Sequence, residues 1–207
     1  MEEVATKILS DRHCQLGEGC TYDPATDTAW WFDIVERTLL QADLASGAVT
    51  THTLPWMASV VAFIDDGRQL LATENGLYIR DIADGRLTLH VPLEADNAAT
   101  RSNDGRVHPC GALWIGTMGR KAEDGAGAIY HFGGGELRRL YSGISIPNAI
   151  CFSPDGATAY FTDSSEGILT ALRSTRRTPC RPEIPRRCST TAAGQVVSTA
   201  PWSMPKD

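Results

Sequence analysis

The sequence predicts an all-β protein with the architecture of a β-propeller. Four stretches share one order of features, in which an apolar residue precedes a polar turn and then a short apolar strand. Their turns begin at Asp23, Asp65, His108 and Ser153, so they recur at intervals of 42, 43 and 45 residues. A period of about 40–45 residues with several short strands is typical of propeller blades. No segment shows the apolar stripe of a long amphipathic helix.

The segments between these turns indicate three or four antiparallel strands in each period. In the first period the strand candidates are TAWWFDI, TLLQADL and VTTHTL, separated by turns at VER and ASG. The order repeats as QLLATE, GLYIRD and RLTLHV, and then as ALWIGT, AIYHF and ELRRLY. A β-sandwich is the alternative, because it also consists of many short strands. A sandwich does not repeat its turn chemistry at a fixed period, so the pattern favours the propeller.

The charge distribution divides the chain near Leu172. Residues 1–172 carry 12 Lys and Arg against 23 Asp and Glu, whereas residues 173–207 carry 7 against 2 and hold five of the 11 prolines. We therefore expect a partial propeller over residues 1–172 and a basic, proline-rich tail over residues 173–207. A basic tail of this kind could bind polyanions, and nucleic-acid binding through it is one alternative function.

Composition excludes several other classes of protein. The net charge of −6 argues against nucleic acid or an anionic membrane as the partner of the whole chain. The first residues are acidic and lack the apolar core of a signal peptide, and no apolar run is long enough to span a bilayer. These features predict a cytoplasmic protein. Its six cysteines show no C-x-x-C pairing, which indicates free thiols.

Four polar residues stand out from the strand pattern and are candidates for a binding site. Glu18 lies in QLGEGC, Arg101 and Asn103 lie in TRSNDGRVHP, and Asn148 lies in GISIPNAICFSPDG. Each could simply stabilise a turn. All four are expected on loops just ahead of an inner strand, where equivalent ends of different blades converge on a central channel. Carboxylate and amide oxygens suit a hard divalent cation such as Ca²⁺, Mg²⁺ or Mn²⁺, and an arginine suits an oxygen-rich or anionic substrate.

Three longer segments together resemble the regucalcin/gluconolactonase family, also called senescence marker proteins. They are LGEGCTYDPATDTAWWFDI, RSNDGRVHPCGALWIGTM and IPNAICFSPDGATAYFTDS, and the resemblance covers roughly residues 8–172. It implies a six-bladed propeller, here incomplete at about three to four blades, that hydrolyses a small-molecule sugar lactone with one divalent cation: Ca²⁺, Zn²⁺, Mg²⁺ or Mn²⁺.

The resemblance also implies roles for the four candidate residues. Glu18 and Asn148 correspond to two metal ligands of the family, and Arg101 and Asn103 to residues that bind substrate. Some members of the family carry a substrate-binding Glu after the GTM strand. This chain has Lys121 at the corresponding place, so no role is carried over to it.

The catalytic aspartate of the family has no counterpart in this sequence. In the family it lies in a DG…DAEG-like stretch, where it is the third protein ligand and the proposed base, and no such stretch occurs here. A one-base shift of the reading frame after Leu172 permits a peptide with this pattern, so we interpret residues 173–207 as frameshifted and disordered. Two functions remain open: a metal-dependent sugar lactonase of doubtful activity, or a non-catalytic propeller fragment that binds a divalent cation.

Overall fold

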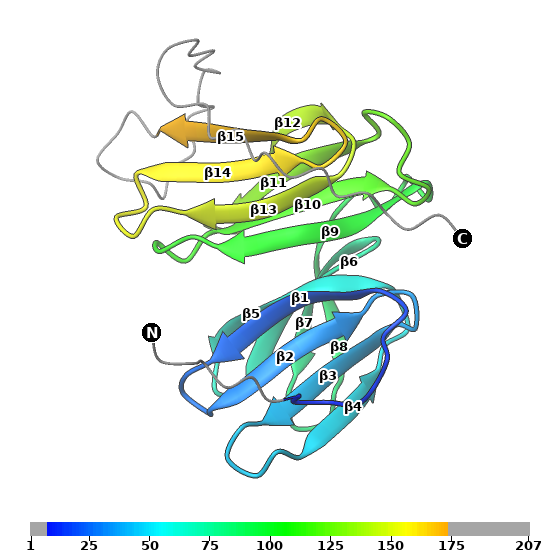
Figure 1. Cartoon of the computed structure of the whole chain (residues 1–207), viewed down its shortest axis with the longest axis vertical. Helices are drawn as coiled ribbons and strands as arrows, with labels where there is room; N and C mark the ends of the chain where they lie inside the picture. The colour runs from blue at the N-terminus through cyan, green and yellow to red at the C-terminus, as the bar shows by residue number, and fades with distance from the viewer. Residues whose placement is uncertain (1–7, 174–207) are drawn as a thin grey trace.

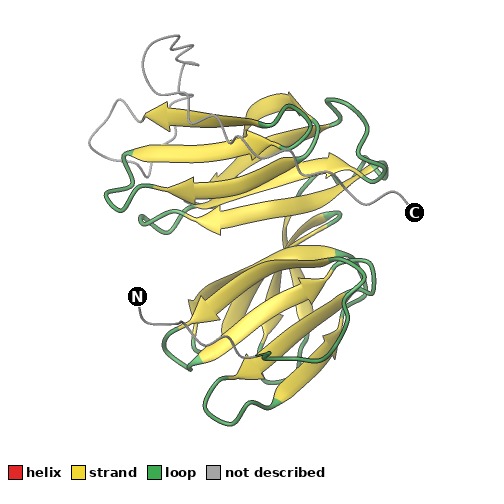
Figure 2. Ribbon diagram, in the orientation of Figure 1, coloured by secondary structure: helices red, strands yellow, loops and turns green. Residues whose placement is uncertain are grey.

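The computed structural model describes residues 8–173, which form fifteen β-strands arranged in four antiparallel sheets (Figures 1 and 2). Within this range there is no helix, and hence none that could cross a membrane. Each sheet follows the chain in simple up-and-down order, so each is one blade of a propeller. The all-β propeller predicted from the sequence is confirmed, and the part of the chain described contains four blades.

The strand boundaries divide the blades as follows. The first blade contains β1 (Gly17–Asp23), β2 (Thr28–Asp33), β3 (Thr38–Asp43) and β4 (Val49–Thr53). The second contains β5 (Ala58–Asp65), β6 (Arg68–Thr73), β7 (Gly76–Asp81) and β8 (Leu87–Pro92). The third contains β9 (Thr100–Val107), β10 (Leu113–Gly119), β11 (Gly127–Gly133) and β12 (Glu136–Ile144). The fourth contains β13 (Pro147–Phe152), β14 (Thr158–Asp163) and β15 (Ile168–Arg173).

The first strands of successive blades lie next to one another. Strand β5 packs against both β1 and β9, and β9 packs in turn against β13. The four repeated turns of the sequence each fall between the first and second strands of a blade. The repeat period of the sequence is therefore the blade period of the structure. The expected tail at residues 173–207 lies outside the described residues apart from Arg173, which ends β15.

Apolar side chains fill the three spaces between successive blades. Trp30, Phe32 and Leu39 of the first blade pack against Val61 and Leu71 of the second. Two further clusters join the second blade to the third and the third to the fourth, with members Val60, Ala62, Leu70, Leu77, Leu113 and Ile115 in one and Trp114, Ile129, Leu140, Ile150, Phe161 and Leu172 in the other. A blade thus buries its faces against its neighbours, as the apolar strand runs require.

The inner strand of three blades carries the same irregularity. In β1, β9 and β13 two residues lie opposite a single residue of the second strand, which is one residue more than a regular ladder has, and these pairs are Gly19–Cys20, Asn103–Asp104 and Ala149–Ile150. Gly19 adopts a φ of 65°, and a Cβ there would lie 2.1 Å from the carbonyl oxygen of Ser59. Only glycine fits at this contact between the first two blades. Bulges of this kind re-aim neighbouring side chains out of the plane of a sheet.

A buried aspartate anchors the entry to the inner strand in the first and fourth blades. Asp163 accepts hydrogen bonds from the backbone N–H groups of Ser145 at 2.6 Å and Ile146 at 2.9 Å. Asp33 does the same for the backbone of Gln15 and Leu16. Burial raises the pKa of Asp163, but the hydrogen bonds from Ser145, Ile146 and Ser165 outweigh it, so the pKa is lowered. These carboxylates satisfy backbone groups that no strand partner reaches.

Replacing Asp163 by Ala is expected to destabilise the fold by about 1–3 kcal/mol, because it removes the acceptor of two backbone N–H groups. The stabilisation by Asp163 is present above its unfolded pKa of ~3.9 and disappears as the pH falls through the lower folded value. Urea unfolding at pH 7 and at pH 3 measures both effects. The exposed turn residue Asp66 supplies the control, and equal losses for Asp66→Ala and Asp163→Ala would contradict the anchoring role.

A buried histidine is expected to make the fold sensitive to acid. His131 on β11 is 2% exposed, and neither ring nitrogen has a hydrogen-bond partner. Burial lowers its pKa, and the charges of the neighbouring Arg138 and of His108 lower it further. The unfolded chain therefore takes up a proton below about pH 6.5 that the folded chain refuses, so stability falls with decreasing pH in that range.

We expect His131→Leu to reduce this dependence between pH 7 and pH 5, since the variant lacks the His131 ring. His52, whose pKa is also lowered by burial, remains in the variant. Unfolding midpoints across the range provide the measurement. An identical slope in wild type and His131→Leu would show that this ring does not govern the acid response.

Candidate functional site

The four residues singled out in the sequence lie near the beginnings of three inner strands, β1, β9 and β13. Glu18 pairs with Phe32, Arg101 with Met118 and Asn148 with Thr162, close to where the second strand of each blade ends. Their expected position on loops ahead of these strands is wrong, because they lie inside β1, β9 and β13. Glu18, Arg101 and Asn148 each have a partner in the ladder, whereas Asn103 lies in the bulge of β9.

Glu18 and Asn148 occupy equivalent positions in the first and fourth blades. In the first blade the anchoring Asp33 pairs with Gly17, and Glu18 is the next residue. In the fourth blade the anchoring Asp163 pairs with Pro147, and Asn148 is the next residue. Each also directly precedes the two-residue bulge. Two residues 130 positions apart in the chain thus share one structural place, as repeated blades require.

A continuous series of hydrogen bonds joins Arg101, Asn103 and Asn148. The Nη1 atom of Arg101 donates to Oδ1 of Asn103 at 2.9 Å. The Nδ2 atom of Asn103 donates to Oδ1 of Asn148 at 3.2 Å and to the carbonyl of Pro147 at 3.0 Å. Nδ2 of Asn148 then donates to Oγ of Ser164 at 2.8 Å. The structure therefore brings three of the four predicted residues into direct contact across the third and fourth blades.

Glu18 interacts electrostatically with Arg101 of this group. Its side chain is exposed, and no residue in the described range 8–173 forms a hydrogen bond with its carboxylate. Burial lowers the pKa of Arg101, while the charge of Glu18 raises it and that of Arg120 lowers it. Glu18 thus lies within electrostatic range of Arg101, and both of its oxygens are open to a ligand.

Asp104 lies beside this site but serves the packing of the blades. Its carboxylate accepts from the backbone N–H of Ile150 at 2.7 Å and of Gly105 at 2.8 Å, and burial raises its pKa. Ser102 on the same strand donates from Oγ to the carbonyl of Ala72 at 3.1 Å and accepts from Ser59 at 2.8 Å. The inner strand β9 is therefore tied by polar contacts to the blades on both sides.

An ion pair links loops of the second and third blades near the site. Arg120 follows β10 and pairs with Glu74, which follows β6. Arg120 also donates to the carbonyl of Ala98 at 2.8 Å. Lys121 is exposed on the same loop, where its backbone N–H donates to Glu123. No sequence pattern predicts the Arg120–Glu74 pair, because its partners lie 46 residues apart.

The donors present fit a hard cation held by few protein ligands. Carbonyl oxygens have two lone pairs, so Oδ1 of Asn148 keeps one after accepting from Asn103. Together with the unpaired carboxylate of Glu18 it forms the all-oxygen donor set that Ca²⁺, Mg²⁺ and Mn²⁺ prefer. Among the described residues no cluster of three or more His, Cys, Asp or Glu side chains could hold a metal. A site here would therefore combine one carboxylate with amide oxygens.

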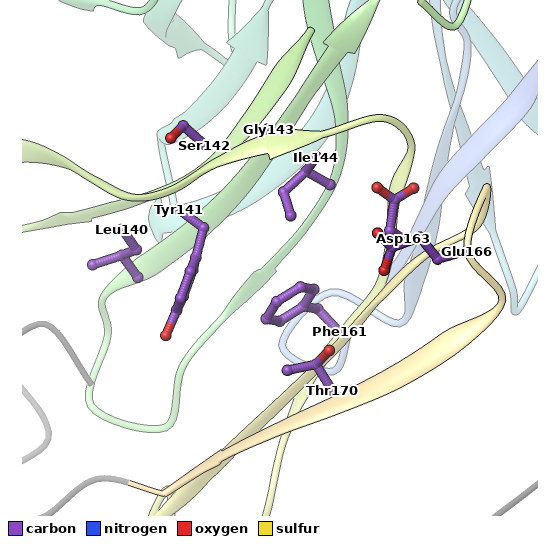
Figure 3. Close-up of a pocket in the computed structure, with 9 residues that line it drawn as sticks. All are labelled: Leu140, Tyr141, Ser142, Gly143, Ile144, Phe161, Asp163, Glu166 and Thr170. Carbon is purple, nitrogen blue, oxygen red and sulfur yellow. The ribbon is translucent and has the colours of Figure 1, made fainter. Parts of the chain in front are cut away.

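A separate cavity lies between β12 of the third blade and β14 and β15 of the fourth (Figure 3). Its volume is about 500 Å³, and its lining is Leu140, Tyr141, Ser142, Gly143, Ile144, Phe161, Asp163, Glu166 and Thr170. None of the four predicted residues contributes to it. Asp163 is already engaged by backbone donors, as described above. The cavity is thus distinct from the site on the inner strands.

Comparison with known proteins places the chain in a family. The family model described as "SMP-30/Gluconolactonase/LRE-like region" matches residues 16–182. The chain belongs to this family. A protein of Rhizobium meliloti (strain 1021) named "Putative sugar lactone lactonase" is 57% identical over 163 residues, which cover 79% of this chain and 55% of that protein. The L-arabinolactonase of Azospirillum brasilense is 33% identical over 162 residues, 76% of this chain and 54% of that protein.

A solved structure agrees in fold. The calcium-binding protein regucalcin from Agrobacterium tumefaciens str. C58 superimposes with a TM-score of 0.82 at 55% sequence identity, covering 84% of this chain and 59% of that one. The chain thus spans between half and two thirds of the length of these family members. The resemblance noted from the sequence motifs is confirmed at the level of family and fold.

Proposed function

We propose that the inner-strand site is part of the active site of a metal-dependent enzyme that hydrolyses sugar lactones. The observation that carries this proposal is the convergence of Glu18, Arg101, Asn103 and Asn148 at one end of the inner strands. Relatives named for lactone hydrolysis support the reaction class, and a neighbour described as calcium-binding supports a divalent cation. A cytoplasmic location stays a prediction from the sequence.

The site residues divide between holding the cation and holding the substrate. Glu18 and Asn148 would bind the cation through oxygen atoms. Such an ion, when bound, polarises the lactone carbonyl and stabilises the developing negative charge. Arg101 would bind oxygen atoms of the substrate, because burial removes competing water from its guanidinium group and strengthens its hydrogen bonds. Asn103 fixes the position of that group through the contact at 2.9 Å.

The residue that takes a proton from the attacking water is not among the four. Asp104 is occupied by two backbone donors, and Glu18 is assigned to the cation. Loss of a general base lowers rates by about 10²–10⁴-fold. We therefore propose that this chain hydrolyses lactones weakly or not at all. The alternative function is a non-catalytic domain that binds a divalent cation. It is favoured because Glu18 and Asn148 could hold a cation, while none of the four site residues could act as the base.

Titration with Mn²⁺, followed by electron paramagnetic resonance, tests the site. We expect Glu18→Ala to abolish binding, because it removes the only carboxylate among the proposed ligands. Glu136→Ala alters an exposed carboxylate on β12 that pairs with Arg138, and it should bind Mn²⁺ like wild type. Equal binding by wild type and Glu18→Ala would refute the proposed metal site.

Hydrolysis of glucono-1,5-lactone by the full chain, with and without Mn²⁺, separates the two functions. A metal-dependent rate that Glu18→Ala removes supports the lactonase. Metal binding that depends on Glu18 without any measurable hydrolysis supports the cation-binding domain.

A further inference from the structure

The side-chain amide of Asn148 is held at both of its ends. Oδ1 accepts from Nδ2 of Asn103 at 3.2 Å, and Nδ2 donates to Oγ of Ser164 at 2.8 Å. The backbone carbonyl of Asn148 also accepts from Oγ1 of Thr162 at 3.2 Å. Sequence motifs drew attention to Asn148. Ser164 follows the end of β14 and is the last residue of the segment IPNAICFSPDGATAYFTDS, but no role was expected for it.

The direction of these hydrogen bonds originates at Arg101. A guanidinium group has N–H donors and no acceptor, so the atom of Asn103 that faces it must be Oδ1. Nδ2 of Asn103 then faces Asn148 and must meet an acceptor, which is Oδ1 of Asn148. The amide nitrogen of Asn148 is left pointing toward Ser164, whose hydroxyl oxygen accepts from it. Each amide in the series has one orientation consistent with its neighbours.

The first blade provides a comparison at the equivalent position. The N–H of Ser164 donates to the carbonyl of Ile146 at 2.9 Å, and the N–H of Ile34 donates to that of Leu16 at 3.0 Å. Ser164 and Ile34 each directly follow the anchoring aspartate of their blade. Ile34 is buried and apolar. The first blade, which carries Glu18, thus has the apolar Ile34 at the position where the fourth blade, which carries Asn148, has the hydroxyl group of Ser164.

The chemistry of the two candidate ligands explains this difference. Both ends of a carboxylate are oxygen, so Glu18 offers a ligand atom whichever way the group is turned. An amide offers oxygen at one end and an N–H₂ donor at the other, and the donor repels a cation. A ligand amide therefore needs a partner that fixes it, as residues behind a metal ligand commonly do.

We propose that Ser164 is a positioning residue for the cation site, acting through Asn148. It holds the plane of the Asn148 amide while Arg101, through Asn103, sets which end is oxygen. Arg101 thereby has a second task beside substrate binding. This inference rests on the proposed function, because it takes Asn148 to be a ligand of the cation.

Mn²⁺ affinity of the full chain, measured by electron paramagnetic resonance, tests the inference. Ser164→Ala should weaken binding by about tenfold, the effect expected for loss of a residue behind a ligand. Ser164→Thr keeps the hydroxyl and should stay within about threefold of wild type. Unfolding midpoints of the three proteins establish that each is folded.

A second background separates orientation from general structure. In Asn148→Asp both ends of the side chain are oxygen, so adding Ser164→Ala should change Mn²⁺ affinity by less than about twofold. An equal loss from Ser164→Ala in both backgrounds would assign Ser164 a merely structural role and overturn the inference. So would wild-type affinity in Ser164→Ala alone. A wild-type chain that binds no Mn²⁺ would overturn the metal site itself and, with it, this role of Ser164.

Discussion

Burial of each blade against the next is the interaction on which the rest of the molecule depends. A single sheet of three or four strands cannot bury its apolar residues alone. These residues are shielded from water in the three clusters between blades. This stacking also fixes the distances between inner strands. Residues from β1, β9 and β13 come together only because the intervening blades are packed face to face.

Hydrogen bonds between the inner strands add to the apolar packing of the blades. The hydroxyl groups of Ser59 and Ser102 join the second and third blades, and the carboxylate of Asp104 joins the third to the fourth. These contacts lie on the strands that carry the candidate site. The same few residues of β9 therefore connect the blades and position Arg101 and Asn103. The candidate site and the contacts between blades share one strand, so substitutions there are expected to affect both.

The reaction class is proposed from relatives, and the structure provides reasons for particular side chains of the candidate site. Glu18 and Asn148 stand in equivalent places of two blades but differ in chemistry, and their surroundings differ accordingly. The bulge of β9 leaves Asn103 without a ladder partner, while the sheet continues on both sides of it. Arg101 orients one amide directly and a second through it. The site is thus an arrangement of single hydrogen bonds imposed on a repeated framework.

The sequence by itself determined the all-β class, the blade period and the four candidate residues. Hydrophobic alternation and turn chemistry are local properties, so they can be read along the chain. Motifs that resemble a known family also drew attention to Arg101, Asn103 and Asn148, three of the four residues in the series of hydrogen bonds. The sequence placed the candidate residues wrongly on loops, because the start of a strand depends on the pairing of two strands and leaves no fixed local signature.

Only the tertiary structure decided which groups meet. The bond from Asn103 to Asn148 joins residues 45 positions apart, and that from Asp104 to Ile150 joins residues 46 apart. The ion pair of Arg120 with Glu74, the burial of His131 and the contact of Ser164 with Asn148 were likewise invisible in the sequence. Each depends on how blades stack and how inner strands bend, which is set by packing between distant segments and not by any one segment alone.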